Sequence, residues 1–326
     1  MSDSKLRFVR SFFGYRFFSI FLVFVALLLF FGFFSPHYRF TSLANIKILL
    51  GSGSEFSIIA LGVGLLMVSG EFDLSVGSIL VFCSFMFIRL FEIGMNLFLA
   101  GFITLGLGAL LGFLNGFITT KARIPSFITT LGTMMLWRGV TLILSLGYTR
   151  PFDTEVSPLL GSILTGKIGG VIPAQAIWFG AFGLVLGLVL HLHKFGNWIY
   201  ATGDNKQAAR AMGINTDRVK TICFMIVGVL CAFVGVMQLL RIESYAATQG
   251  LGFELKAIAS SVVGGTFLMG GVGSIAGIFL GTLTIQILEN GLILMRVPVF
   301  GVSAFIGVAI ILFVILNTYM GRKIIR

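Results

Sequence analysis

The sequence predicts an all-α polytopic membrane protein, and three observations lead to this prediction. The chain of 326 residues is 57% hydrophobic and only 11% charged, so a soluble fold would lack the polar residues to cover its surface. Unbroken apolar runs, such as residues 17–34 and 174–192, reach the ~20 residues that cross a bilayer. A β-barrel would instead show alternating segments of ~10 residues.

About ten spans are expected, within one transmembrane domain that covers residues 1–326. Their expected ranges are 17–34, 44–69, 75–91, 96–118, 125–147, 174–192, 221–241, 254–269, 274–295 and 298–319. Lys and Arg gather in the leader 1–16, around residue 121, in 194–220 and at the C-terminus, and the outer loops hold fewer. By the positive-inside rule, both termini are expected in the cytoplasm.

The net charge of +11 does not indicate a nucleic-acid partner, because the basic residues lie at span ends, where anionic lipid explains them. The three cysteines, Cys83, Cys223 and Cys231, lie in apolar runs without metal or disulfide spacing and are expected to be small apolar fillers. The run GSILTGK (161–167) fits most of a P-loop, but Ile168 stands where a Ser or Thr is needed. We therefore expect no catalytic residue, cofactor or metal site.

Two polar or glycine-rich breaks, GEFDLSVGS (70–78) and GGTFLMGGVGS (264–274), interrupt the apolar pattern. Broken helices are tolerated in a membrane only where they are buried in protein or line a watery cavity. Both breaks are therefore expected at the edge of a translocation path, with flanking helices that run in opposite directions. The segments LNGFI (114–118) and ENGLI (289–293) also echo each other. Together these features suggest the hypothesis of two inverted five-helix repeats.

Acidic residues within a membrane are costly and usually functional, which directs attention to the breaks and to the ninth span. For Asp73 we favour a simpler role, as the N-cap of a helix that begins near Leu74. The candidates for the pathway are Glu71, Asp73, Ser75, Gly265, Glu289 and Asn290.

Glycines recur every four residues in two places and predict helices that pack closely. They are Gly108, Gly112 and Gly116, and Gly273, Gly277 and Gly281.

Residues 196–220 (GNWIYATGDNKQAARAMGINTDRVK) form the only long polar segment of the chain. Asp204 or Asn205 is placed to cap a short helix, and Gln207 follows Asp204 by three residues, as in a capping box. Gly213 then supplies a left-handed stop. From the residues alone, the segment is either a solvated connector or a handle that another protein grips.

Four motifs occur in order along the chain: the break at 70–78, KARIPSFITTLGTMMLWRG (121–139), the polar segment 196–220, and ELKAIASSVVGGTFLMGGVGSIAGIFLGTLTIQILENGL (254–292). From about residue 44 onward, they resemble the membrane subunits of ribose-type ATP-binding-cassette sugar importers. The resemblance implies a ten-helix permease in the bacterial inner membrane, paired with a second copy or a sister permease. It also implies a cytoplasmic ATP-binding-cassette subunit, which hydrolyses ATP in place of this chain, and a periplasmic sugar-binding protein.

The same resemblance implies that residues 194–220 are a cytoplasmic coupling segment that inserts into a groove of the ATPase. The matching residues are Asp204, Asn205, Gln207, Ala208, Ala209, Arg210 and Gly213. The implied solute is a ribose-like monosaccharide. Typical members carry Gly and Ile before the aspartate, where this chain has Glu71 and Phe72, and this departure leaves the solute less certain than the fold.

Other solutes in the same superfamily remain open: nucleosides, a furanose signal molecule or branched-chain amino acids. A rival from another class is a stand-alone secondary transporter driven by an ion gradient. It would need an ion site, for which Glu71, Asp73 and Glu289 are the candidates.

Overall fold

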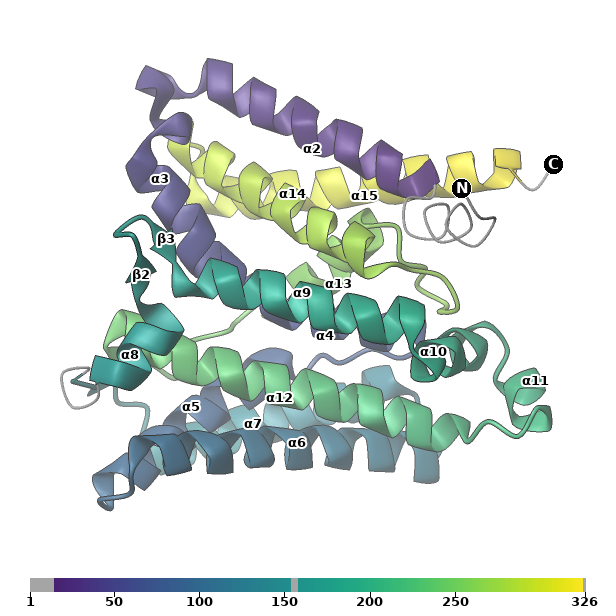
Figure 1. Cartoon of the computed structure of the whole chain (residues 1–326), viewed down its shortest axis with the longest axis horizontal. Coiled ribbons are helices and arrows are strands. Elements are labelled where there is room, and N and C mark those ends of the chain that lie inside the picture. The colour runs from purple at the N-terminus through teal and green to yellow at the C-terminus, as the bar shows by residue number, and fades with distance from the viewer. Residues whose placement is uncertain (1–14, 154–157, 325–326) are drawn as a thin grey trace.

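Long apolar helices lie side by side along one axis of the molecule (Figure 1). The computed structural model describes residues 15–153 and 158–324, so most of the predicted leader 1–16 lies outside the described residues. In chain order, the elements are α2 (Tyr15–Phe34), the 3₁₀ helix η1 (Pro36–Thr41), α3 (Leu43–Ile48), the π-helix η2 (Leu49–Gly53), α4 (Ser54–Val68), α5 (Val76–Glu92), α6 (Leu97–Lys121), α7 (Ser126–Ser145), β1 (Arg150–Pro151), α8 (Pro158–Thr165), β2 (Lys167–Ile168), β3 (Ile172–Pro173), α9 (Ala174–Leu192), α10 (Lys194–Asp204), α11 (Lys206–Ala211), α12 (Thr216–Ile242), β4 (Ser244–Tyr245), α13 (Phe253–Val263), α14 (Ile275–Leu294) and α15 (Val299–Ile324).

The prediction of an all-α polytopic membrane protein is confirmed. Within the described residues, seven helical stretches are long and apolar enough to cross a membrane. Each predicted span overlaps a helix, although α5 has only 17 residues and α13 only 11. The eighth predicted span, 254–269, is wrong at its end. The helix stops at Val263, and the glycine-rich residues that follow form a loop that leads into α14.

Helix α4 lies at the centre of the bundle, and all of its residues are buried. Apart from Ser54, Glu55 and Ser57 in its first turn, it is apolar all round, as expected for a helix enclosed by protein, and it packs against α9, α12, α13 and α14. The main core joins residues of α4, α5 and α12. A smaller cluster joins α2 and η1 to α14 and α15.

The predicted glycine-mediated packing is confirmed for five of the six glycines. A Cβ atom on Gly108 would lie 2.4 Å from the carbonyl oxygen of Gly228, and one on Gly112 would lie 2.2 Å from that of Phe224. Only glycine therefore permits the approach of α6 to α12. Gly116 packs on α12 in the same way, and Gly277 and Gly281 pack on the end of α13, whereas Gly273 belongs to the loop before α14.

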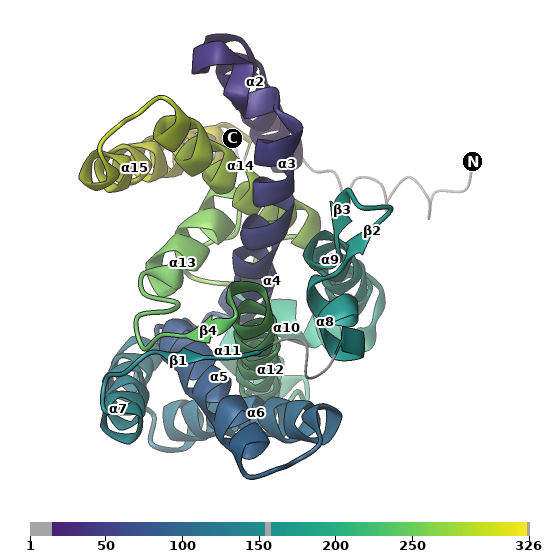
Figure 2. The same cartoon turned by 90° about the vertical axis from the view of Figure 1, so that its left-hand side faces the viewer.

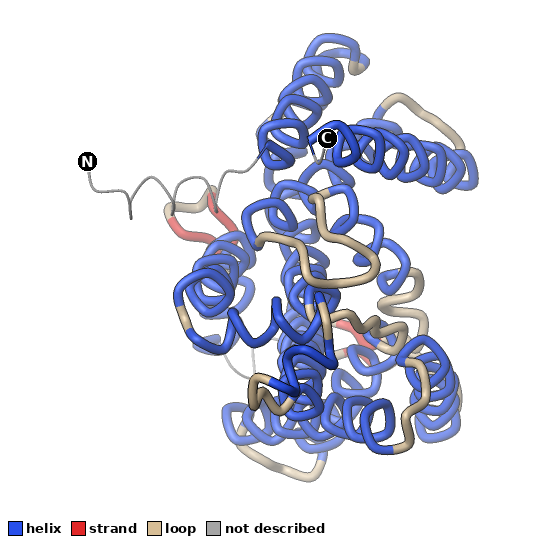
Figure 3. Tube along the Cα trace, turned by 90° about the vertical axis from the view of Figure 1, so that its right-hand side faces the viewer, coloured by secondary structure: helices blue, strands red, loops and turns tan. Residues whose placement is uncertain are grey.

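The helices that precede the two breaks run in the same direction, which corrects the expectation of opposite directions. Phe56 and Phe253, near the starts of α4 and α13, have ring centroids 5.3 Å apart. Further along both helices, a Cβ on Gly64 would lie 2.9 Å from Ser261 Oγ. Helices α4 and α13 are therefore parallel, and both breaks lie at the end of the molecule that carries α10 and α11. Figure 3 views the molecule from this end.

Helices α6 and α14, which carry the echoed segments LNGFI and ENGLI, run in opposite directions (Figure 1). This orientation agrees with inverted repeats, which remain a hypothesis.

At the opposite end, the described part of residues 148–173 forms a small folded element. Strand β1 pairs with β4, β2 pairs with β3, and α8 packs on α9 and α12 (Figure 2). Trp178 Nε1 donates a hydrogen bond of 2.9 Å to the carbonyl oxygen of Ile163 and ties α8 to α9. Gly161 to Thr165 are helical, so the partial P-loop motif has no P-loop geometry.

Candidate functional site

The polar segment folds into two short helices, α10 and α11, at one end of the bundle (Figure 1). Helix α10 was not predicted from the sequence, although the spacing of its buried residues Gly196, Ile199 and Thr202 is the signal of an amphipathic helix. His193 caps α10, because its Nδ1 accepts a hydrogen bond from the amide of Phe195.

Helix α11 has a defined cap at each end. Asn205 is its N-cap, and its Oδ1 accepts the amides of Gln207 and Ala208 at 3.0 Å each. The predicted capping box between Asp204 and Gln207 is wrong, because Asp204 is the last residue of α10. The predicted left-handed stop is confirmed: Gly213 has φ +83° and follows the helix in a Schellman motif.

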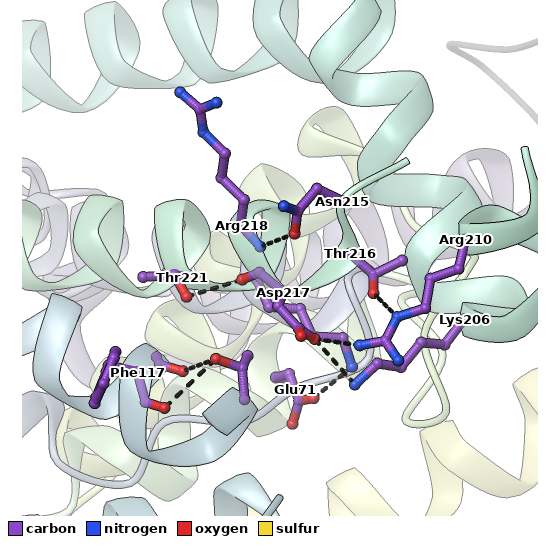
Figure 4. A network of polar contacts seen from close by, with 12 residues as sticks. Glu71, Phe117, Lys206, Arg210, Asn215, Thr216, Asp217, Arg218 and Thr221 are labelled. Carbon is purple, nitrogen blue, oxygen red and sulfur yellow. Dashed lines mark hydrogen bonds and ion pairs between the residues drawn. The ribbon is translucent and has the colours of Figure 1, made fainter. Parts of the chain in front are cut away.

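An ion-pair network fastens α11 to the start of α12 (Figure 4). Asp217 accepts Arg210 Nη2 at 2.6 Å and lies 3.4 Å from Lys206 Nζ. Arg210 Nε also donates to Thr216 Oγ1 at 2.8 Å. Lys206 and Arg210 are four residues apart, so both side chains reach one carboxylate from the same helix face. The sequence analysis did not identify this acceptor.

The two faces of α11 differ in exposure. Ala209 is 2% exposed and packs inward, whereas Gln207 and Ala208 are exposed. The helix therefore presents one face to solvent on a rigid base.

Four glycines bring α10 into backbone contact with both breaks. This glycine junction consists of Gly70, Gly203, Gly270 and Gly271. A Cβ on Gly203 would lie 1.9 Å from the carbonyl oxygen of Val68 and 2.6 Å from the amide nitrogen of Gly271. A Cβ on Gly270 would lie 2.6 Å from Gly70 Cα, and the Gly271 amide donates to Val68 O at 2.9 Å. The end of α4, the end of α10 and the second break thus meet without intervening side chains.

Tyr200 adds a side-chain link between α10 and the second break. Its hydroxyl donates a hydrogen bond of 2.7 Å to the carbonyl oxygen of Gly273. Burial raises the pKa of Tyr200 to about 12, so the hydroxyl keeps its proton at neutral pH and remains a donor.

The first break is held by hydrogen bonds and one ion pair. The amides of Phe72 and Leu74 donate to Ser126 Oγ and Thr130 Oγ1 of α7, at 3.1 and 3.0 Å. Glu71 accepts Lys220 Nζ at 2.5 Å, and both side chains are largely buried. The extra carboxylate that departs from the family pattern is therefore paired with a cation of α12.

Asp73 and Ser75 lie in a fully buried polar cluster with Asn115. Asp73 Oδ1 accepts the amide and the hydroxyl of Ser75 at 2.8 and 2.6 Å, and Asn115 Nδ2 donates to Ser75 Oγ at 2.8 Å. The predicted N-cap role of Asp73 is wrong, because α5 begins at Val76 with Ser75 at the N-cap position. Asp73 instead shapes the turn that leads into α5.

The remaining pathway candidates lie elsewhere. Gly265, with φ +88°, turns the chain after α13 in the second break. Glu289 pairs with Lys256 of α13, and Asn290 exchanges two side-chain hydrogen bonds of 2.9 Å with Asn45. The polar partners of Glu289 and Asn290, the two polar residues singled out in the ninth predicted span, are therefore Lys256 and Asn45. The structure does not bring Glu289 and Asn290 together with Glu71 or Asp73.

A further ion pair, between a buried glutamate and a partly exposed arginine, was not predicted from the sequence. Glu55, which is 0% exposed, accepts Arg241 Nε and Nη2 at 2.6 and 2.9 Å. Glu55 is the only acidic residue in the second predicted span, and that was a usable signal.

Fold and site together define a multi-pass helical membrane protein in which two helices, α4 and α13, end at the two breaks and a capped polar segment contacts both. The chain belongs to the family described as branched-chain amino acid transport system / permease component, which it matches over residues 45–316. It is therefore a transport permease.

Relatives with assigned names are similar over most of their lengths. The xylose/arabinose import permease protein XylH of Sulfolobus acidocaldarius is 36% identical over 94% of this chain and 85% of its own length. The ribose import permease protein RbsC of Escherichia coli K12 is 36% identical over 79% of this chain and 81% of its own. The autoinducer 2 import system permease protein LsrC of Photorhabdus luminescens is 32% identical over 89% and 87%. No solved structure matches.

Proposed function

We propose that this chain is the membrane permease subunit of an ATP-binding-cassette importer and forms the pathway for a monosaccharide. The relatives named for pentoses, at 36% identity, support a ribose-like sugar over the other solutes. The relatives named for autoinducer 2 are 32–33% identical. The sugar-named relatives also favour this solute class over branched-chain amino acids, which appear only in the family description.

The observation that carries the proposal is the glycine junction beneath a rigid, doubly capped α11. A movable ATPase needs a handle that does not bend and a connection that transmits displacement. In the proposed mechanism, ATP binding closes two ATPase subunits, α11 moves with them, and α10 passes the displacement to both breaks. The resulting rocking exposes the pathway alternately to the two sides.

The coupling residues are proposed to be Asp204, Asn205, Gln207, Ala208, Ala209, Arg210 and Gly213. The exposed face of α11 contacts the ATPase, and the buried face fixes the helix. Glu71, Asp73, Ser75, Gly265, Glu289 and Asn290 are proposed to act along the pathway or at its edges. The surroundings of the residues at the breaks, which are Glu71, Asp73, Ser75 and Gly265, would change as the glycine junction moves.

The proposed assembly contains a second permease copy or a sister permease, an ATP-binding-cassette subunit that hydrolyses ATP, and a periplasmic sugar-binding protein. We place the permease domain, residues 1–326, in the cytoplasmic (inner) membrane, with the leader 1–16 and the coupling segment 194–220 inside. In Figure 1, the start of α2 and the end of α15 lie at the end that carries α10 and α11. This arrangement supports two cytoplasmic termini.

The test is reconstitution of the chain in vesicles, alone and with its ATPase and binding protein. ATP-driven pentose accumulation is expected only in the complete system. Accumulation against a gradient by the chain alone would show a stand-alone transporter and refute the proposal.

A single substitution tests the coupling face directly. Ala208→Glu places a charge on the exposed face of α11, where glutamate is compatible with a helix. It is expected to abolish co-purification of the ATPase while leaving the amount of permease in the membrane unchanged. Ser162→Glu, an exposed position of α8 at the opposite end, is the matched control and should retain the ATPase. Equal ATPase recovery with both variants would contradict the assignment of α11.

A further inference from the structure

A pocket of about 310 Å³, with a mainly apolar lining and several polar side chains, lies at the end of the bundle opposite α11, which the proposed orientation makes the outer half. It forms between η2, the first turns of α4 and α13, the last turn of α12, and the second half of α14. We call it the outer pocket. Its lining residues include Ser52, Phe56, Gln238, Arg241, Lys256 and Glu289.

The charges that line the outer pocket are compensated within the protein. Arg241 is paired with Glu55 through two hydrogen bonds, and Lys256 is paired with Glu289. Among the described residues that line it, the pocket therefore presents no uncompensated charge to a ligand, and a charged ligand would have to displace one of these pairs. A neutral ligand suits it better than an ion or a zwitterion.

The paired groups still have hydrogen-bonding capacity that faces the pocket. The side chain of Arg241 is 33% exposed, and those of Lys256 and Glu289 are 20% and 35% exposed. A guanidinium carries five N–H donors, of which Glu55 takes two, and an ammonium carries three. Sugar hydroxyls both donate and accept, so they match this mixture of donors and acceptors.

An aromatic wall completes the outer pocket. Phe56 and Phe253 lie edge to face with centroids 5.3 Å apart, and Lys256 Nζ lies 4.5 Å from the centroid of the Phe56 ring. Small-molecule sites combine such apolar walls with a few placed polar groups, and the volume lies at the small end of their usual range. Phe56 is only 2% exposed and Lys256 Nζ covers its ring, so the apolar surface that the C–H groups of a pentose can contact comes mainly from the partly exposed Phe253.

We propose that the outer pocket binds the solute as a neutral polyhydroxylated molecule of monosaccharide size before it crosses the bundle. This inference rests on the proposed sugar-import function and assigns a binding site for the solute within the permease. The Lys256–Glu289 pair contacts the solute, and the Glu55–Arg241 pair holds the guanidinium in place from the buried side.

Cysteine protection tests the proposal in the assembled importer. Ser52 lines the pocket, and the native cysteines Cys83, Cys223 and Cys231 are buried, so they give little background. In Ser52→Cys, saturating D-ribose, D-xylose or L-arabinose should slow labelling by N-ethylmaleimide about tenfold at about ten times the Kd. Ser162→Cys on α8 is exposed outside the pocket, and its labelling rate should not change.

The outcomes separate the pocket from the importer function. No protection by a pentose that the same vesicles accumulate with ATP would overturn the outer pocket and leave the function standing. Protection by leucine in place of the pentoses would overturn the neutral-solute assignment. If the complete importer accumulates none of these pentoses, the proposed function fails for this solute class, and the inference fails with it.

A charge exchange gives a second measurement that does not depend on the cysteine variant. Lys256→Glu combined with Glu289→Lys keeps an ion pair between α13 and α14 but reverses its orientation toward the pocket. With equal amounts of assembled complex, pentose uptake should fall at least tenfold, because the donors and acceptors that face the sugar are exchanged. Unchanged uptake would show that the pair is only structural and would overturn its assigned contact with the solute.

Discussion

Replacing Gly203 with alanine should uncouple ATP hydrolysis from uptake, because the added methyl group has no space in the glycine junction. Its Cβ would lie 1.9 Å from the carbonyl oxygen of Val68, whereas ordinary contact begins at 3.4 Å. The end of α10 must therefore move by about 1.5 Å, since a close-packed backbone offers no side chain that can turn away.

The size of the effect follows from this displacement. Overpacking of this kind costs about 1–3 kcal/mol, and the strain falls on the contact through which the proposed lever acts. Each 1.4 kcal/mol corresponds to about a factor of ten, so ATP-driven pentose uptake should fall about tenfold or more. ATP hydrolysis by the bound ATPase should continue, because α11 and its caps are untouched.

The assay compares uptake and ATP hydrolysis by the complete importer in the same vesicles. Gly180→Ala in α9 is the matched control, since nothing in the described part of the chain lies within 4 Å of its added Cβ, and both rates should stay near wild type. Wild-type uptake by the Gly203 variant, at equal membrane content, would refute transmission through the junction. So would an equal loss of uptake and hydrolysis, which would indicate a failure of assembly.

Two further substitutions test the supports of the coupling segment and of the first break. Asn205→Ala removes the acceptor for two amides of α11 and should destabilise that helix by about 1 kcal/mol, which faster amide exchange at Gln207 and Ala208 would reveal and an unaltered rate would contradict. Lys220→Met leaves Glu71 buried without its cation and should lower stability by about 3–5 kcal/mol, seen as a lower unfolding temperature in detergent. Adding Glu71→Gln should restore most of that loss, and no recovery in the double variant would argue against the pair as the cause.

The helices and their glycine stripes could be predicted from the sequence because the membrane imposes both features locally. A bilayer fixes the length of an apolar run, and glycines four residues apart mark one helix face. These rules located α6 and the face that Gly112 and Gly116 turn toward α12. The eighth span failed because Val263 is followed by glycines that end the helix early, while the hydropathy of 264–269 continues.

The partners of Glu71 and Glu289 could not be predicted, because they come from distant parts of the chain. Glu71 and Lys220 are separated by 149 positions, and Lys256 and Glu289 by 33. Nothing local in the sequence couples such positions. Both caps of α11 could be predicted, because Asn205 was one of the two N-cap candidates and Gly213 was the expected stop. The capping box at Asp204 was wrong because α10, which ends there, was not recognised as a helix.

The parallel course of α4 and α13 has a consequence for how the proposed importer works. Both helices point the same way and end at the glycine junction, so a single displacement of α10 by the ATPase reaches them together. Neither can respond while the other stays still. Under this mechanism, the two breaks of one subunit would move as a unit, and a partly shifted intermediate would be short-lived.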